Sequence, residues 1–182
     1  MTGGIRSGKS HFAQELALKS GEPVLFVATA TAGDEEMRQR IEAHQKARPA
    51  TWITLESTIN IGNQILKNTG KAKTVIVDCI TLLINNIFVQ HSEHDGEWLD
   101  APLLEQKVLT EIGELTHCID RVKADFIIVT NEVGLGLVPA DKMSRLYRDL
   151  LGKANQMLAQ HADEVYLMVA GLPLMIKPAG TL

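Results

Sequence analysis

The sequence predicts an α/β fold in which a mostly parallel sheet is covered by helices on both faces. Two observations predict it: short runs that are almost entirely apolar, and longer segments between them whose apolar residues recur three or four positions apart. Runs without a polar face are typical of strands buried from both sides, and their alternation with helices is typical of doubly wound domains. The 182 residues are enough for a sizeable core, and we expect one domain over residues 1–182.

The strand candidates are residues 23–29, 74–78, 125–130 and 164–170. Apolar residues at helical spacing run from Leu104 to Val122 and from Met143 to Leu158. Pro139 is expected at the first position of the second of these helices, where its missing N–H costs nothing.

Composition excludes several classes of protein. With 18 Lys and Arg against 22 Asp and Glu, the net charge is −4, which argues against a general nucleic-acid binder. A hydrophobic fraction of 45% excludes a disordered chain. No apolar run approaches the roughly 20 residues of a membrane helix. Cys79 and Cys118 are expected to be reduced thiols in the core, so we expect a cytoplasmic protein with no membrane insertion.

A phosphate-binding motif lies at the start of the chain. Residues 3–10, GGIRSGKS, match G-x-x-x-x-G-K-[ST]. Such a loop curls so that backbone N–H groups converge on phosphate oxygens, and the helix that follows directs its positive end at them. Lys9 would reach the β- and γ-phosphates, and the Ser10 hydroxyl would bind Mg²⁺. Asp78 ends an apolar run and would contact the same metal, although an Asp at a strand end is more often a turn or cap residue.

The strand that normally precedes such a loop is almost missing. Only Met1 and Thr2 stand before Gly3, so the first strand is expected to be truncated at the N-terminus. Our hypothesis is a gene start assigned too late, which mass spectrometry of the native protein would test.

The absence of other nucleotide-binding motifs, together with the length of the chain, narrows the class of P-loop protein. Signalling GTPases need D-x-x-G and N-K-x-D motifs, which are absent: Asp78 is followed by Cys-Ile-Thr, and Asn131 is followed by Glu. Helicases and transport ATPases are usually larger. A small-molecule kinase fits this length.

Basic residues gather between residues 34 and 52. Arg40, His44 and Arg48 are four residues apart and would share one helix face. A solvated basic face is the simpler interpretation. The alternative is that the neutral ring of His44 attacks phosphorus while guanidinium groups hold the anionic oxygens.

Six segments together carry a resemblance to a known family. In order they are GGIRSGKS, VATA, RIEAHQKARPATW, DCIT, TNEVGLGLVP and RLYRDLLGKANQ. They resemble the bifunctional adenosylcobinamide kinase/adenosylcobinamide-phosphate guanylyltransferase family of cobalamin biosynthesis, and the resemblance runs from Thr2 almost to the C-terminus.

This resemblance implies a three-layer P-loop NTPase fold, RecA-like, with a mostly parallel sheet, assembled as a homotrimer. It implies an enzyme that phosphorylates adenosylcobinamide with ATP or GTP. The same enzyme would then transfer GMP from GTP to adenosylcobinamide phosphate, through a GMP-histidine intermediate, giving adenosylcobinamide-GDP. Mg²⁺ would accompany the nucleotide.

The resemblance also implies roles for individual residues. His44 would be the guanylylated nucleophile, with Lys9 as the second catalytic residue, and Ser10 and Asp78 would bind the metal. The positions implied to bind nucleotide are Gly3, Gly4, Ile5, Arg6, Ser7, Gly8, Lys9, Ser10, Thr29, Ala30, Thr31, Gln45, Lys46, Ala47, Arg48, Glu56 and Asp78.

The sequence departs from the family pattern beside the nucleophile. Ala43 replaces the first of two consecutive histidines, which puts in doubt any assisting role for that histidine. Gln45 replaces a lysine, with Lys46 one residue later, and Asp78 stands where some relatives have Glu.

Two alternative functions stay open at this point. One is a P-loop kinase of another small alcohol, with His44 purely structural and no guanylyltransferase activity. The other is a non-catalytic trimer that binds GTP without transferring any part of it.

Overall fold

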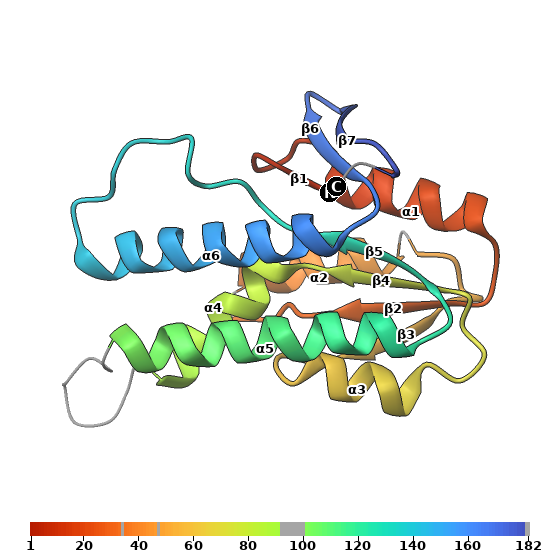
Figure 1. Cartoon of the computed structure of the whole chain (residues 1–182). Coiled ribbons are helices and arrows are strands. Elements are labelled where there is room, and N and C mark those ends of the chain that lie inside the picture. The colour runs from red at the N-terminus through yellow and green to blue at the C-terminus, as the bar shows by residue number, and fades with distance from the viewer. Residues whose placement is uncertain (34, 47, 92–100, 181–182) are drawn as a thin grey trace.

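The computed structural model describes residues 1–33, 35–46, 48–91 and 101–180, without the side chains of Glu36, Met37 and Arg40. Helices and strands are mixed along the chain (Figure 1). The strands are β1 (Thr2–Gly3), β2 (Val24–Ala28), β3 (Ile53–Glu56), β4 (Thr74–Asp78), β5 (Asp125–Val129), β6 (Val165–Val169) and β7 (Leu172–Lys177). The helices are α1 (Lys9–Ser20), α2 (Glu35–Lys46), α3 (Ile61–Asn68), α4 (Ile80–His91), α5 (Ala101–Arg121) and α6 (Lys142–His161).

Four strands form an all-parallel sheet in the order β3-β2-β4-β5, and β1-β6-β7 form a second sheet in which only β7 is antiparallel. Hydrogen bonds join the two sheets. The amino group of Met1 donates to the carbonyl of Ile128 at 2.7 Å, and the Glu132 N–H donates to the carbonyl of Gly3 at 3.0 Å. The short strand β1 therefore lies between β5 and β6, and the mostly parallel sheet predicted from the sequence is confirmed.

Helices cover both faces of the sheet, because alternate strand residues point in opposite directions. Val24 and Phe26 of β2 pack with Ala13 and Ala17 of α1 on one face. Leu25 and Val27 point to the other face, which α3, α4, α5 and α6 cover. This gives three layers, with the larger hydrophobic core on the second face.

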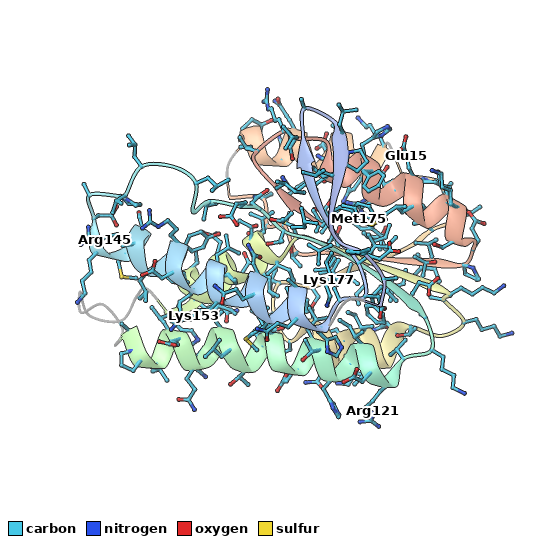
Figure 2. The ribbon with its side chains drawn as sticks, turned by 45° about the horizontal axis from the view of Figure 1, so that its top comes forward. Glu15, Arg121, Arg145, Lys153, Met175 and Lys177 are labelled. Carbon is cyan, nitrogen blue, oxygen red and sulfur yellow. The ribbon has the colours of Figure 1, made fainter. Side chains whose placement is uncertain are left out.

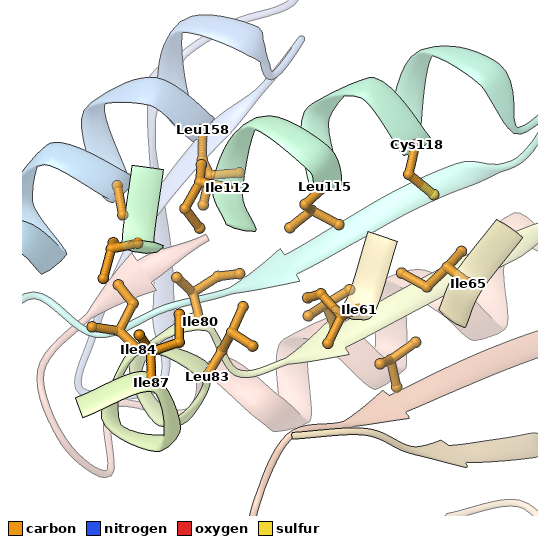
Figure 3. Close-up of a cluster of buried hydrophobic side chains, with 14 of the residues drawn as sticks. Ile61, Ile65, Ile80, Leu83, Ile84, Ile87, Ile112, Leu115, Cys118 and Leu158 are labelled. Atoms are coloured by element: carbon orange, nitrogen blue, oxygen red, sulfur yellow. The ribbon is translucent and has the colours of Figure 1, made fainter. Parts of the chain in front are cut away.

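Branched aliphatic side chains dominate that larger core. Ile61 and Ile65 of α3 lie beside Leu115 and Cys118 of α5, while a second group of isoleucines from α4 lies nearer Ile112 (Figure 3). All of these side chains are at most 4% exposed, so the core holds α3, α4 and α5 firmly against β4.

The four strand candidates are confirmed to within two residues, and the two long helices are confirmed as α5 and α6. The position of Pro139 was predicted wrongly. Helix α6 begins at Lys142, because the side chain of Asp141 accepts a hydrogen bond from the Ser144 N–H at 2.7 Å and caps the helix there. Pro139 lies in the connection that precedes this cap.

Hydrogen bonds join the last strand, β7, to the C-terminal end of α6. The ammonium group of Lys177 (Figure 2) donates to the carbonyls of Ala159, Gln160 and Ala162 at 3.1, 3.1 and 2.6 Å. A cation at a helix C-terminus pairs with carbonyls that lack partners within the helix. This contact fixes the β6–β7 hairpin, which in turn packs against the phosphate-binding loop.

Candidate active site

A cleft of about 1290 Å³ opens at the carboxyl ends of the parallel strands. Ala28, Asp78 and Val129, the last residues of β2, β4 and β5, all line it. In open α/β sheets this edge is where ligands bind. Much of its lining comes from two groups of residues, which we call its two ends: residues 5–10 at the phosphate loop, and α2 with residues 56–60.

The phosphate loop, residues 3–10, is packed closely against the β6–β7 hairpin. Gly3 has a φ of +149°, and a Cβ at this position would lie 2.5 Å from the carbonyl oxygen of Met168. Gly8 has a φ of +93°, and its Cβ would lie 3.0 Å from the Cα of Gly171. The Gly171 N–H also donates to the carbonyl of Ser7 at 3.0 Å. Both glycines are therefore required by their backbone conformation and by their close neighbours.

Lys9 is buried, and its ammonium group is held by its own loop. The Nζ donates to the carbonyls of Gly3 and Gly4 at 3.0 and 2.6 Å, and to the Ser7 Oγ at 3.4 Å. Burial lowers the pKa of Lys9, while the nearby Asp78 acts to raise it. The loop thus holds a cation at one end of the cleft in a fixed place.

Ser10 and Asp78 are adjacent, as the metal hypothesis requires. The Ser10 hydroxyl donates to the Asp78 carboxylate. Burial raises the pKa of Asp78, whereas this hydrogen bond and the positive charges of Arg48 and Lys9 lower it. Two hard oxygen ligands side by side suit Mg²⁺, which proteins commonly bind through one or two such groups together with substrate phosphates.

His44 lies near the end of α2, lines the cleft and is exposed. It interacts electrostatically with Asp78, so the predicted nucleophile and the predicted metal ligand lie in the same part of the cleft. Gln45 donates to Glu56 at 3.0 Å, which links the end of α2 to the end of β3. Lys46 is exposed and is not part of the cleft lining.

Arg48 lies just after α2 and is anchored on aromatic rings. Its guanidinium carbon is 3.7 Å from the centre of the Phe26 ring, and Phe26 stacks on Trp52. The Nε and Nη1 atoms are buried with no hydrogen-bond partner among the described residues. Burial lowers the pKa of Arg48, and Asp78 and Glu56 oppose this effect. A buried guanidinium with free donors beside a cleft is a strong candidate for binding an anion.

The remaining predicted positions divide into three groups. Ala30, Thr31, Ile5 and Arg6 line the cleft. Thr29 is fully buried and does not: its hydroxyl accepts from the Cys79 N–H and donates to the Cys79 carbonyl, both at 2.8 Å. Ala47 and the side chain of Arg40 lie outside the described residues. Arg48 lies beyond the last residue of α2, so it does not share a helix face with His44 as predicted, although both residues line the cleft.

Sequence reasoning missed one side of the cleft, which we call the wall segment (residues 57–60). Two buried side chains hold it. The Asn86 amide donates to the carbonyls of Thr29 and Thr58 at 2.8 and 3.1 Å. The Glu111 carboxylate accepts from the N–H groups of Asn60 and Ile61 at 2.9 and 2.8 Å. Neither contact is visible as a local motif, because each joins residues far apart in the chain.

Comparisons with known proteins identify the family of this chain. The family model described as cobinamide kinase / cobinamide phosphate guanyltransferase matches residues 1–176. The chain belongs to this family.

Curated members of the family align over nearly the whole chain. The bifunctional adenosylcobalamin biosynthesis protein CobU of Salmonella typhimurium is 38% identical over 178 residues, which cover 97% of this chain and 98% of that protein. The Escherichia coli protein of the same name is 37% identical with the same coverage. The bifunctional protein CobP of Pseudomonas aeruginosa is 38% identical over 175 residues, 96% of this chain and 94% of that protein.

Proposed function

We propose that this protein phosphorylates adenosylcobinamide with ATP or GTP and then transfers GMP from GTP to the phosphate that it has made. The observation that carries this proposal is that His44 lines the same cleft as Lys9, Ser10 and Asp78. One cleft thus combines a phosphate loop with an accessible imidazole. A kinase of another small alcohol would need only the first of these.

The phosphate loop would serve the kinase step. A hydroxyl oxygen of adenosylcobinamide forms a bond to the γ-phosphorus, and the bond from that phosphorus to the β–γ bridging oxygen breaks. The nucleoside diphosphate leaves, and the hydroxyl proton passes to water. Lys9 and the start of α1 would hold the phosphate oxygens. Ser10 and Asp78 would hold Mg²⁺, which when bound supplies charge neutralisation at the transferred group.

Residues at the α2 end of the cleft would carry out the guanylyl transfer. A neutral ring nitrogen of His44 forms a bond to the α-phosphorus of GTP, and pyrophosphate leaves. An oxygen of adenosylcobinamide phosphate then displaces His44 from that phosphorus and restores the free imidazole. Arg48, with its unpaired buried donors, is suited to hold oxygens of the α-phosphate through both displacements.

The proposal extends to assembly and location. Among the described helices, none combines the length and the apolar character needed to cross a bilayer. Cys79 and Cys118 are buried and unpaired, which suits a reducing cytoplasm. We expect a homotrimer, and light scattering should give about 60 kDa for three chains of 20.0 kDa each.

Labelling with GTP tests the function. Protein incubated with α-labelled GTP and Mg²⁺ should acquire a label that is labile to acid and stable to alkali, as expected for a phosphorus–nitrogen bond to histidine. His44→Ala should abolish the label and retain phosphorylation of adenosylcobinamide. His117→Ala, which removes an exposed imidazole of α5 outside the cleft, is the matched control and should label normally.

Each other outcome has a clear meaning. A label that survives His44→Ala would reject His44 as the nucleophile. Phosphorylation without any label would identify a P-loop kinase of the simpler kind. Binding of GTP without either reaction would leave a non-catalytic nucleotide-binding trimer.

A further inference from the structure

The segment that follows β5, residues 130–132, is fixed by more main-chain hydrogen bonds than a connecting loop needs. Three consecutive N–H groups donate alternately to the N-terminal segment and to α4. The Thr130 N–H donates to the carbonyl of Met1 at 3.0 Å, that of Asn131 to the Thr81 Oγ1 at 2.8 Å, and that of Glu132 to the carbonyl of Gly3 at 3.0 Å. The Gly3 carbonyl also accepts from Lys9, so this segment and the phosphate-loop lysine share one acceptor.

Helix α6 holds the same segment from the other side. The Asn155 Nδ2 donates to the carbonyl of Asn131 at 3.0 Å, and the Asn155 Oδ1 accepts from the Thr130 hydroxyl at 2.7 Å. Tyr147 of α6 donates to the carbonyl of Thr81 at 2.8 Å and so anchors Thr81 as well. These contacts account for two polar side chains of α6, and both serve to fix the main chain of residue 131.

The direction of the Asn131 side chain follows from this arrangement. The hydroxyl of Thr130 donates to Asn155 of α6, and Thr130 does not line the cleft. Asn131 lines the cleft, together with Lys9, Asp78 and Cys79. Val129 is the register partner of Asp78, so Asn131 lies two residues beyond the level of that carboxylate.

The amide of Asn131 itself has no hydrogen-bond partner among the described residues, although the N–H and carbonyl of the same residue both have one. Among the described residues, no hydrogen bond of the fold depends on this amide. A fixed main chain that presents a free amide to a phosphate site is a pre-organised donor of the kind that stabilises transferred charge.

We infer that Asn131 is a catalytic residue of the phosphoryl transfer, and that its amide donates to a non-bridging oxygen of the γ-phosphoryl group. This inference rests on the proposed function. The amide supplies a hydrogen bond only and takes up no proton, while the acceptor oxygen–phosphorus bond forms and the bond to the β–γ bridging oxygen breaks. Thr81 and Asn155 are positioning residues, because they act through the main chain of Asn131.

The two half-reactions provide the test. Asn131→Leu keeps the volume of the side chain and removes the amide. Its kcat for phosphorylation of adenosylcobinamide should fall about a hundredfold, with KM for ATP or GTP within about threefold of wild type. Labelling of His44 with α-labelled GTP should stay within about threefold, which also shows that the variant is folded. Asn85→Leu, at an exposed position of α4 outside the cleft, should leave both activities unchanged.

Two results would overturn the inference. One is a phosphorylation rate within threefold of wild type. The other is an equal loss in both half-reactions, which would indicate a purely structural role. If the wild-type protein does not phosphorylate adenosylcobinamide at all, the proposed function fails first, and the inference fails with it.

A double-mutant cycle tests the positioning residues. Thr81→Val removes the acceptor for the Asn131 N–H and should lower kcat about tenfold, and Thr81→Ser, which retains the hydroxyl, should restore it. Combined with Asn131→Leu, Thr81→Val should cause no further loss of kcat, because the group that it positions is already absent. Additive losses in the double variant would show that Thr81 does not act through Asn131.

Discussion

The two ends of the cleft differ in how firmly their cations are held. At the phosphate-loop end, Lys9 is buried and donates to the carbonyls of Gly3 and Gly4. At the α2 end, the side chain of His44 is exposed, whereas the guanidinium of Arg48 lies over the face of Phe26.

This difference suits the two kinds of chemistry that we propose for the cleft. A group that only stabilises charge works best when it is fixed before the substrate arrives, since no reorganisation is then needed. A nucleophile that takes GMP from one substrate and gives it to another must be reached twice, so exposure suits it. We therefore expect substitutions at the first end to change kcat, and substitutions at the second end to act mainly on binding and labelling.

The largest expected effect is at the phosphate-loop end. Lys9→Met removes the charge and keeps an unbranched side chain, and phosphorylation of adenosylcobinamide should slow about a thousandfold. Labelling of His44 should fall by less than about tenfold, as measured by incorporation from α-labelled GTP. Lys19→Met, an exposed position near the other end of the same helix, is the control and should show neither effect. Equal losses in both assays would mean that the two ends do not act separately.

A smaller effect is expected from the anchored cation of the α2 end. Arg48→Lys keeps the charge but loses the planar guanidinium that lies over Phe26 and its free Nε donor. The KM for GTP in the labelling reaction should rise about 10- to 100-fold, while phosphorylation with ATP changes by less than about threefold. Arg38→Lys, at an exposed arginine of the same cleft, should leave both within about threefold. An unchanged KM for Arg48→Lys would show that the guanidinium of Arg48 does not bind the nucleotide.

The smallest expected effect concerns the wall segment, which is held by the buried carboxylate of Glu111. Glu111→Gln leaves one of the two N–H groups of Asn60 and Ile61 without an acceptor, and the free energy of unfolding should fall by about 1–3 kcal/mol. Urea unfolding measures this loss. Glu105→Gln, at a partly exposed position of the same helix whose carboxylate pairs with Lys153 at the surface, should cost less than about 0.5 kcal/mol.

The pH dependence of this loss gives a further check. Burial raises the pKa of Glu111 above its ordinary value, although the two backbone N–H groups oppose it. At pH values between the ordinary pKa of a glutamate and the raised pKa of Glu111, the native state binds more protons than the unfolded state. The stability that Glu111 contributes therefore falls as the pH rises through this window. Gln does not titrate. The loss caused by Glu111→Gln should therefore be larger near pH 5 than near pH 7, and a reversed order would contradict the assigned burial.

The sequence predicted the elements that carry a strong local signal. Strands β2, β4, β5 and β6 are runs of apolar residues, and these were identified almost to the residue. Strands β3 and β7 were not identified. Strand β3 has no apolar run, and β7, although mostly apolar, is exposed, contains Pro173 and follows β6 after only two residues. That the chain forms one domain stays a prediction.

The candidate site was predictable where it depends on short motifs. Lys9, Ser10, Asp78 and His44 were named from spacing and resemblance, and all four line one cleft. Thr29 was predicted to contact nucleotide, yet it is buried beneath the site. The roles of these residues in catalysis stay predictions.

Other parts of the site could not be predicted in this way. The contact of Arg48 with Phe26 and the bonds from Glu111 to the wall segment exist only once helices and strands have packed together. Glu111 in particular lies at the buried face of a long amphipathic helix, where nothing in the local pattern reveals which distant N–H groups its carboxylate will accept from.

The close approach of Gly8 and Gly171 limits which substitutions and truncations this protein can accept. The tip of the last hairpin supports the phosphate loop from behind, so a chain cut before β6 would retain every residue of the nucleotide motif and still lose the surface that shapes it. A side chain gained at Gly8 would need the hairpin tip to shift. The first and last thirds of the chain therefore cannot be exchanged or trimmed independently, even though only the first carries a recognisable phosphate-binding motif.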